Sequence, residues 1–294
     1  MAQAGGDERH DRGLEFDLET LLGRRKALKL LAGAGLLTLA GCAGSRTHES
    51  AGTSSSTATT TGSGASTTAT TAAGSAGSAG AAADCSTAIP EETGGPYPAD
   101  GTNGPNALRQ SGIVRSDIRS SFTASTGTAQ GVPLSINLTI LNKNKNCAAL
   151  NNAAVYVWHC NRDGLYSLYS KGVTDQNYLR GVQSTDKNGR VTFRSIFPAC
   201  YSGRWPHIHF EVYPSVGKAT SASGKIATSQ IALPEDACRT VFATEGYRSS
   251  LTNLARVTLA TDNVFGDGYS HQLGTVAGSM AKGFTVELAV PVSA

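Results

Sequence analysis

Apolar and polar residues alternate along much of the second half of the chain. Within residues 132–141 every even position is apolar. A period of two is typical of a strand with one buried face. Residues 190–196 repeat the pattern directly after a turn-like sequence at residues 186–189. Further strands are predicted over residues 154–160, 205–213 and 282–292.

Helical periodicity is rare by comparison. Residues 233–243 are the one segment for which we expect a short helix. The predicted strands are short, and Gly, Asn, Asp and Pro separate them, as turn residues do. The fold class that this pattern predicts is all-β, an antiparallel β-sandwich with little helix.

The first third of the 294-residue chain has a different composition. Residues 43–84 are almost wholly Ser, Thr, Ala and Gly and contain no Phe, Tyr or Trp. Such a segment cannot bury enough apolar surface to offset the entropy of ordering it, so we expect a disordered, flexible tether. The sandwich domain is then residues 85–294, which is long enough for a hydrophobic core.

Residues 1–42 have the layout of an export signal. Arg24 and Arg25 are typical of the twin-arginine route, and they precede an apolar stretch, residues 30–40, that is too short for a comfortable membrane span. The stretch ends in Leu-Ala-Gly-Cys, which resembles a bacterial lipobox with Cys42 as the lipidated new N-terminus. We therefore expect an exported bacterial lipoprotein, at the cell surface or in the periplasm. A non-cleaved anchor, or nearby cleavage that leaves Cys42 free, is the alternative.

Charge and cysteine content narrow the partners and the compartment. The net charge is only +3 and no basic run with interleaved aromatic residues appears, so nucleic acid is not an expected partner. No C-x-x-C pair is present, which disfavours a thiolate zinc site. In an oxidising compartment we expect two disulfides and one free thiol, with the connectivity open. The cysteines concerned are Cys85, Cys147, Cys160, Cys200 and Cys238.

Candidate chemistry is concentrated in residues 200–210. His207 and His209 stand two apart in a predicted strand, so their side chains share one face and can reach one metal ion together. Two histidines on one strand face also occur simply as polar surface, so the pair alone leaves both interpretations open. Tyr201 and Arg204 add a phenol and a guanidinium to the same stretch, and this favours a metal site.

Ordered sequence blocks extend from residue 90 to residue 247. They include PEETGGPY at residues 90–97, VRSDIR at 114–119, GVPL at 131–134, GLYS at 164–167, LRGVQ at 179–183, FPACY at 197–201 and then Arg204-x-x-His207-x-His209. In content and order these blocks resemble the intradiol ring-cleavage dioxygenases, the family of catechol 1,2-dioxygenase and protocatechuate 3,4-dioxygenase. The secreted single-domain branch of that family is the most similar.

The resemblance implies a non-haem Fe(III) centre and the intradiol cleavage of catechol-type aromatics by O₂ to cis,cis-muconate-type products. The implied iron ligands are Tyr166, Tyr201, His207 and His209. The donor chemistry agrees, because phenolate is a hard anionic donor and imidazole suits iron. Taken alone, Tyr166 would more simply be a buried tyrosine with a satisfied hydroxyl.

Three residues receive catalytic roles from the same resemblance. Tyr201 would be the axial tyrosine, which a catechol displaces and which accepts a catechol proton. Arg204 would stabilise negative charge on the ring; the alternative is a surface arginine paired with a carboxylate. Gln230 would lie beside the iron ligands and orient them.

Two other functions remain open on the sequence. A surface-displayed module could bind aromatic compounds or polysaccharide without turnover, but it would not need this set of tyrosines and histidines. A zinc hydrolase could use the H-x-H pair, yet no evident carboxylate base lies nearby. Trp158 is expected in the core, His159 is left open as a further ligand, and the oligomeric state is open as well.

Overall fold

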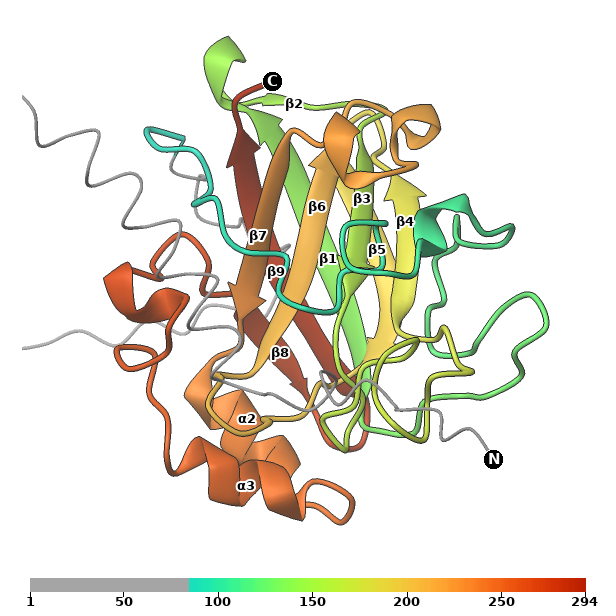
Figure 1. Ribbon diagram of the computed structural model, residues 1–294. Helices are drawn as coiled ribbons and strands as arrows, with labels where there is room; N and C mark the ends of the chain where they lie inside the picture. The colour runs from blue at the N-terminus through green and yellow to red at the C-terminus, as the bar shows by residue number, and fades with distance from the viewer. Residues whose placement is uncertain (1–84) are drawn as a thin grey trace, which may run out of the picture. The chain divides into compact units, whose positions relative to one another are not determined.

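The computed structural model describes residues 85–294 of the chain. The predicted export signal, the lipobox Cys42 and the tether lie outside the described residues. In the described part, strands dominate (Figure 1). The strands are β1 (Pro133–Asn142), β2 (Ala148–Ala149), β3 (Ala154–Trp158), β4 (Arg180–Ser184), β5 (Arg190–Ile196), β6 (His207–Tyr213), β7 (Ala227–Ala232), β8 (Thr275–Ser279) and β9 (Gly283–Val292). The helices are α2 (Glu235–Phe242), α3 (Arg248–Leu254) and the short 3-10 turns η2 (Ala107–Arg109), η3 (Lys143–Lys145), η4 (Val216–Lys218), η5 (Ala222–Gly224) and η6 (Phe265–Asp267).

The strands form the two sheets of a β-sandwich. The first sheet has five strands in the order β2-β1-β9-β8, with β5 also paired to β1, and the second has four in the order β4-β3-β6-β7. The predicted all-β sandwich with little helix is therefore confirmed. Its strands pair antiparallel with one exception, the parallel pair β1 and β9. Parallel pairing needs a long connection, and most of the domain lies between these two strands.

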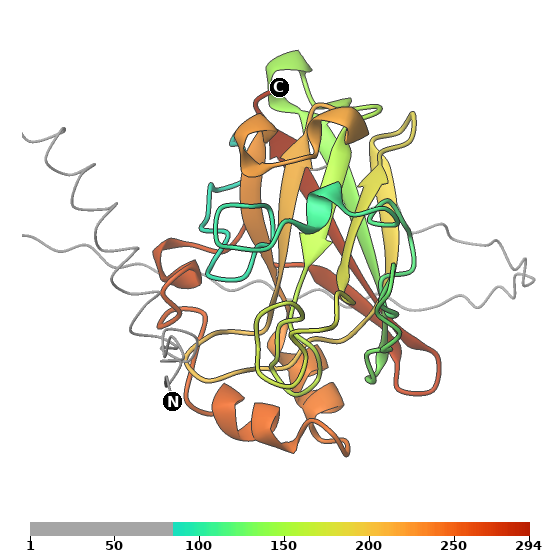
Figure 2. The ribbon, with the colours of Figure 1, turned by 45° about the vertical axis from the view of Figure 1, so that its right-hand side comes forward.

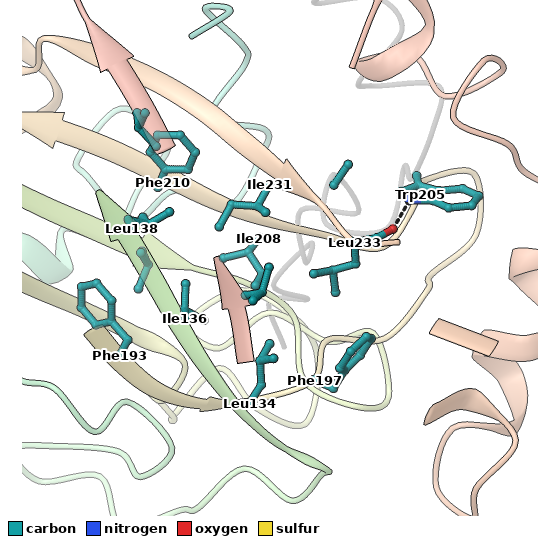
Figure 3. Close-up of a cluster of buried hydrophobic side chains, with 14 of the residues drawn as sticks. Leu134, Ile136, Leu138, Phe193, Phe197, Trp205, Ile208, Phe210, Ile231 and Leu233 are labelled. Atoms are coloured by element: carbon teal, nitrogen blue, oxygen red, sulfur yellow. Dashed lines mark hydrogen bonds between the residues drawn. The ribbon is translucent and has the colours of Figure 1, made fainter. Parts of the chain in front are cut away.

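The core lies between the two sheets. Along β1 the even positions that the sequence marked as apolar are buried, among them Leu134, Ile136 and Leu138. Figure 3 shows these side chains directed toward Ile208 and Phe210 of β6. A fully buried aliphatic side chain contributes about 1.5–3 kcal/mol, so this alternation supplies much of the stability of the sandwich.

Strand β6 differs from β1 because it is buried along its whole length. Ile208 and Phe210 face the sandwich core, so His207 and His209 face the opposite side of the sheet. That side is covered by loops, whose side chains form a second apolar cluster with those of β3. The cluster includes Leu108, Tyr156, Trp158, Tyr166, Tyr169 and Ala199. The fold thus covers His207 and His209 with a cluster that is rich in aromatic side chains.

The two α-helices lie together at one end of the sandwich (Figure 2). Helix α2 falls within the predicted helix and buries Val241 and Phe242, with Phe242 edge-on to Phe197 at 5.9 Å between ring centroids. Helix α3 was not predicted, because its seven residues bury only Ser250 and Leu254 and show no clear period. No helix in the described part has the length and apolar character needed to cross a membrane.

The cysteines depart from the prediction of two disulfides. Within residues 85–294 one disulfide joins Cys85 to Cys147, and three cysteines are free and buried. The thiols of Cys160, Cys200 and Cys238 each donate to a main-chain carbonyl, at 3.7, 3.4 and 3.9 Å respectively. Burial raises the pKa of Cys160 and of Cys200 to about 12, so these thiols stay protonated and unreactive.

Candidate metal centre

The two histidines of β6 come together as the strand period predicts. His207 and His209 are each 2% exposed, and their Nε2 atoms lie 3.1 Å apart. In the sheet, His209 stands opposite Trp158 of β3 on one side and opposite Gln230 of β7 on the other. The pair therefore sits in the middle of the second sheet, on its loop-covered face.

Both predicted tyrosine ligands reach the same point from loops. The phenol oxygen of Tyr166 lies 3.4 Å from Nε2 of His207, and that of Tyr201 lies 3.3 Å from the same nitrogen. The two phenol rings meet edge to face with centroids 5.9 Å apart. The structure thus brings together all four side chains that the sequence named as iron ligands.

The loop that carries Tyr166 is shaped by its own polar side chains. Asn161 accepts hydrogen bonds from the amides of Asp163 and Leu165, both at 2.9 Å, and so forms an Asx turn. Gly164 has φ +83°, and a Cβ there would stand 3.1 Å from Cβ of Tyr201. A glycine is therefore needed both for the left-handed backbone and for the close approach of the two tyrosine loops.

Each histidine ring is held in a fixed orientation. Nδ1 of His207 donates to the carbonyl of Trp205 at 2.5 Å, which leaves Nε2 with its lone pair directed at the cluster. The ring of His209 instead stacks on Trp158, with centroids 4.9 Å apart and planes 5° from parallel. Gly95, at φ +68°, packs closely against the same ring, since a Cβ there would stand 3.3 Å from Cε1 of His209.

Burial keeps both imidazoles neutral. It lowers the pKa of His207 to about 3, with a further contribution from the charge of Arg204. It also lowers the pKa of His209 well below its ordinary value, and the neighbouring His207 adds to this. Burial raises the pKa of Tyr166 well above 10, so a phenolate at this place needs a compensating cation. The neutral imidazoles are already in the form that binds a metal ion, whereas the phenol would release its proton when a metal ion binds.

The geometry fits a metal ion. Two ligands that are about 2.0–2.1 Å from one ion stand about 2.9 Å apart at right angles and about 3.6 Å apart at 120°. The separations of 3.1, 3.3 and 3.4 Å around Nε2 of His207 fall in this interval. Among the described residues no group of three or more His, Cys, Asp or Glu side chains could hold a metal ion. A metal here would therefore need the phenol oxygens, and two phenolates with two imidazoles suit iron.

Arg204 lies beside this cluster but is not a surface arginine. It is 2% exposed, its Nε donates to Asp262 at 3.0 Å and its Nη2 donates to Gln230 at 2.8 Å. The carboxylate of Asp262 also accepts from the amides of Trp205 and Val264, at 2.7 and 2.8 Å. The alternative interpretation was a surface arginine paired with a carboxylate; the carboxylate partner is present, but the surface location is wrong.

Asp262 is the residue at the site that the sequence did not identify. A buried arginine requires a counter-charge, and that rule could have indicated that a carboxylate partner exists. It could not select Asp262, which is 58 residues further along the chain. Gln230 stands opposite His209 in the sheet, and its amide donates to the carbonyl of Thr93 at 3.0 Å.

His159 has both ring nitrogens engaged in other contacts. Nδ1 lies 2.8 Å from the carbonyl oxygen of Cys160, and Nε2 lies 2.6 Å from the hydroxyl of Ser195. Burial lowers its pKa to about 4, so the ring is neutral. Trp158 is fully buried as predicted, and its stacking on His209 makes it part of the wall of the site.

Comparisons with known proteins find a matching family model and similar solved structures. Residues 104–220, which include both tyrosines and both histidines, match the family model described as Dioxygenase. Among solved structures, the chain is similar to an intradiol ring-cleavage dioxygenase from Tetranychus urticae, with 24% identity and a TM-score of 0.56 over 70% of this chain and 94% of that one. The dioxygenase domain of a dioxygenase and carbohydrate-binding fusion from Streptomyces sp. SirexAA-E has 20% identity and a TM-score of 0.44, over 70% of this chain and 97% of that one.

One curated relative adds a local match. Catechol 1,2-dioxygenase 2 of Acinetobacter lwoffii is 43% identical over 53 residues, which are 18% of this chain and 19% of that protein. The match therefore spans about a fifth of the relative's length. The family-model match confirms the predicted resemblance to the intradiol ring-cleavage dioxygenases, and the similarity to the solved structure from Tetranychus urticae shows a shared fold.

Proposed function

We propose that this protein is an Fe(III)-dependent dioxygenase that opens catechol rings between the two hydroxylated carbons. The single observation that carries the proposal is the convergence of two phenol oxygens and Nε2 of His209 within 3.4 Å of Nε2 of His207. Both atoms of one O₂ enter the product, so that catechol and O₂ yield one cis,cis-muconic acid. Atoms balance without a further reductant.

The proposed iron ligands are Tyr166, Tyr201, His207 and His209. When bound, the ferric ion supplies Lewis-acid activation of the catechol oxygens and a route for electrons from the ring to O₂. The protein contributes a dry, shaped site around it. Trp158 and Tyr166 are buried, and Tyr97 packs on Tyr166 with ring centroids 4.8 Å apart.

The two tyrosines differ in a way that separates their roles. Tyr166 is 2% exposed, whereas Tyr201 is only half-buried. Tyr201 is therefore the phenol that can turn away when a substrate arrives, and its oxygen is placed to take a catechol proton. His207 and His209 keep their positions during this exchange, because a main-chain carbonyl and a stacked indole hold them.

Arg204 supplies fixed positive charge at the edge of the site. Asp262 and Gln230 hold its guanidinium, so it does not have to reorient when negative charge develops on the ring. Preorganised charge in a buried site is worth far more than the same charge in water. We propose this electrostatic role for Arg204 and a positioning role for Gln230.

We propose further that residues 1–42 export the protein by the twin-arginine route and that Cys42 anchors it by a lipid. The support is the arginine pair followed by the apolar stretch and the lipobox. Expression in a bacterium with labelled fatty acid tests this. Label should enter the native protein and be absent from a Cys42→Ala variant; label in both variants, or in neither, would contradict the anchor.

Oxygen uptake tests the proposed reaction. The iron-loaded protein should consume one O₂ per catechol and form a product with muconate absorbance, and Tyr201→Phe should lower the rate at least tenfold. Tyr269→Phe, at an exposed position, is the matched control and should keep the rate. Binding of catechol without any O₂ uptake would contradict the proposal and favour a non-catalytic binding module.

A further inference from the structure

Arg180, the first residue of β4, is fully buried, with 0% of its surface exposed. Arginine stays charged in proteins, and burying a charge costs several kcal/mol unless it is well compensated. In the described part of the chain no carboxylate forms an ion pair with it. A side chain that only filled space here would be apolar, so the contacts of this guanidinium need their own explanation.

The guanidinium joins three separate parts of the domain. Nε donates to the hydroxyl of Ser167 at 3.1 Å and Nη2 donates to the carbonyl of the same residue at 2.9 Å. Nη1 donates to the carbonyl of Pro98 and to the hydroxyl of Tyr156, both at 3.2 Å. Tyr156 itself donates to the carbonyl of Pro98 at 2.8 Å. The guanidinium of Arg180 therefore connects strand β3, the loop directly after Tyr166 and the chain at Pro98.

Pro98 belongs to residues 92–99, which we call the leading segment. This segment crosses the site at which the four side chains converge. In Figure 1 the segment is the teal trace in front of β7, β6 and β3. It is bonded to β7 at one end, where the amide of Glu92 donates to the carbonyl of Thr228 at 2.8 Å. At the other end the amide of Ala99 donates to the hydroxyl of Tyr169 at 2.9 Å.

Between its ends the leading segment touches three residues of the site. The carbonyl of Thr93 accepts from Gln230, Gly95 closes over His209, and Tyr97 packs on Tyr166. None of these hydrogen bonds joins Arg180 directly to Tyr166, Tyr201, His207 or His209. Arg180 reaches those side chains only through the leading segment and through the loop at Ser167.

We propose that Arg180 is a positioning residue for the metal centre. Its fork fixes the leading segment to the Tyr166 loop, so that the phenol of Tyr166 and the ring of His209 are held where one ion can bind both. The inference rests on the proposed iron site, because positioning matters only if these side chains bind a metal. A neutral or shorter side chain at residue 180 would leave the carbonyls of Pro98 and Ser167 without this common donor.

Iron retention and amide exchange in the full-length protein test the role. Arg180→Lys keeps the charge but loses the fork, and Tyr156→Phe is a milder change that removes one hydroxyl from the same contact. Both should release iron to a chelator at least tenfold faster than the native protein and shift its visible band. Amide exchange over residues 92–99 should also become faster in the metal-free protein.

Tyr247→Phe is the matched control for the loss of a buried hydroxyl. This hydroxyl donates to the carbonyl of Phe197 at 2.7 Å and accepts from the amide of Val132 at 3.1 Å, and neither partner belongs to the leading segment. The control should lose folding stability and keep its iron. If Tyr156→Phe and Arg180→Lys release iron no faster than this control, the positioning role is refuted while the iron site stands. A native protein that binds no iron would refute the proposed function, and this inference with it.

Discussion

Removing the charge of Asp262 is the sharpest single test of how the site is held. The carboxylate is fully buried and pairs with a guanidinium that is 2% exposed. In Asp262→Asn the side chain keeps its shape but has only one acceptor oxygen. That oxygen can accept from the amide of Trp205 or from the amide of Val264, which bond to different oxygens of the carboxylate. The charge of Arg204 is then left in the interior without a counter-charge. Breaking a buried ion pair from one side costs about 3–5 kcal/mol, so we expect a loss of this size in the free energy of unfolding.

Equilibrium unfolding in urea at pH 7 measures this loss, with Glu235→Gln as the control. Glu235 and Arg239 form an ion pair at 2.6 Å as well, but both side chains are about half exposed, at 51% and 54%. Its removal should cost only about 0.3–0.5 kcal/mol. A loss below about 1 kcal/mol for Asp262→Asn would refute the reasoning, because the site would then tolerate an unpaired Arg204.

The loss of stability caused by Asp262→Asn should depend on pH. Burial alone would raise the pKa of Asp262, but the charge of Arg204 and the amide of Trp205 bring it below its ordinary value of 3.8. A group with a lowered folded-state pKa contributes stability above its unfolded pKa and loses it as the pH falls through the folded value. The difference in stability between the native protein and Asp262→Asn should therefore narrow below pH 3.8. A difference that stays constant to pH 2 would contradict this.

Two further predictions concern the sandwich itself. Ile136→Ala opens a cavity in the core and should lower the free energy of unfolding in urea by about 2–5 kcal/mol. Val114→Ala, at a side chain that is 53% exposed, should change it by no more than about 0.5 kcal/mol. Equal losses in the two variants would contradict the assigned core. Replacing Cys85 and Cys147 by serine together should cost about 4 kcal/mol, as the loop entropy of a 62-residue separation implies. In a Cys42→Ser background a thiol titration in denaturant should find three free thiols, and a single thiol would restore the two-disulfide prediction.

Local periodicity was enough to predict five of the nine strands in the described part, namely β1, β3, β5, β6 and β9, and to place His207 and His209 on one strand face. An alternating pattern has physical content by itself, since residues two apart in a strand share a face. That rule placed His207 beside His209 and Leu134 in line with Ile136. The two tyrosine loops were placed by the resemblance to a known family, because nothing in their own sequence tells how far they reach.

The residues that hold the site in place could not be predicted in this way. Asp262 and Arg180 act over long sequence separations, and a sequence without aligned relatives gives no pairing between distant positions. The parallel pairing of β1 with β9 was missed for the same reason. The cysteine prediction failed because it counted thiols and could not know that Cys160 and two others are buried against main-chain carbonyls.

Visible absorption of the iron-loaded protein tests the central claim most directly. Two phenolates on ferric iron should give a strong visible band, and catechol added under nitrogen should shift it before any O₂ is admitted. Tyr166→Phe and Tyr201→Phe should each weaken or shift the band, because each removes one phenolate donor. A protein that stays colourless after anaerobic reconstitution with iron, or a band that neither substitution changes, would contradict the metal centre built from Tyr166, Tyr201, His207 and His209.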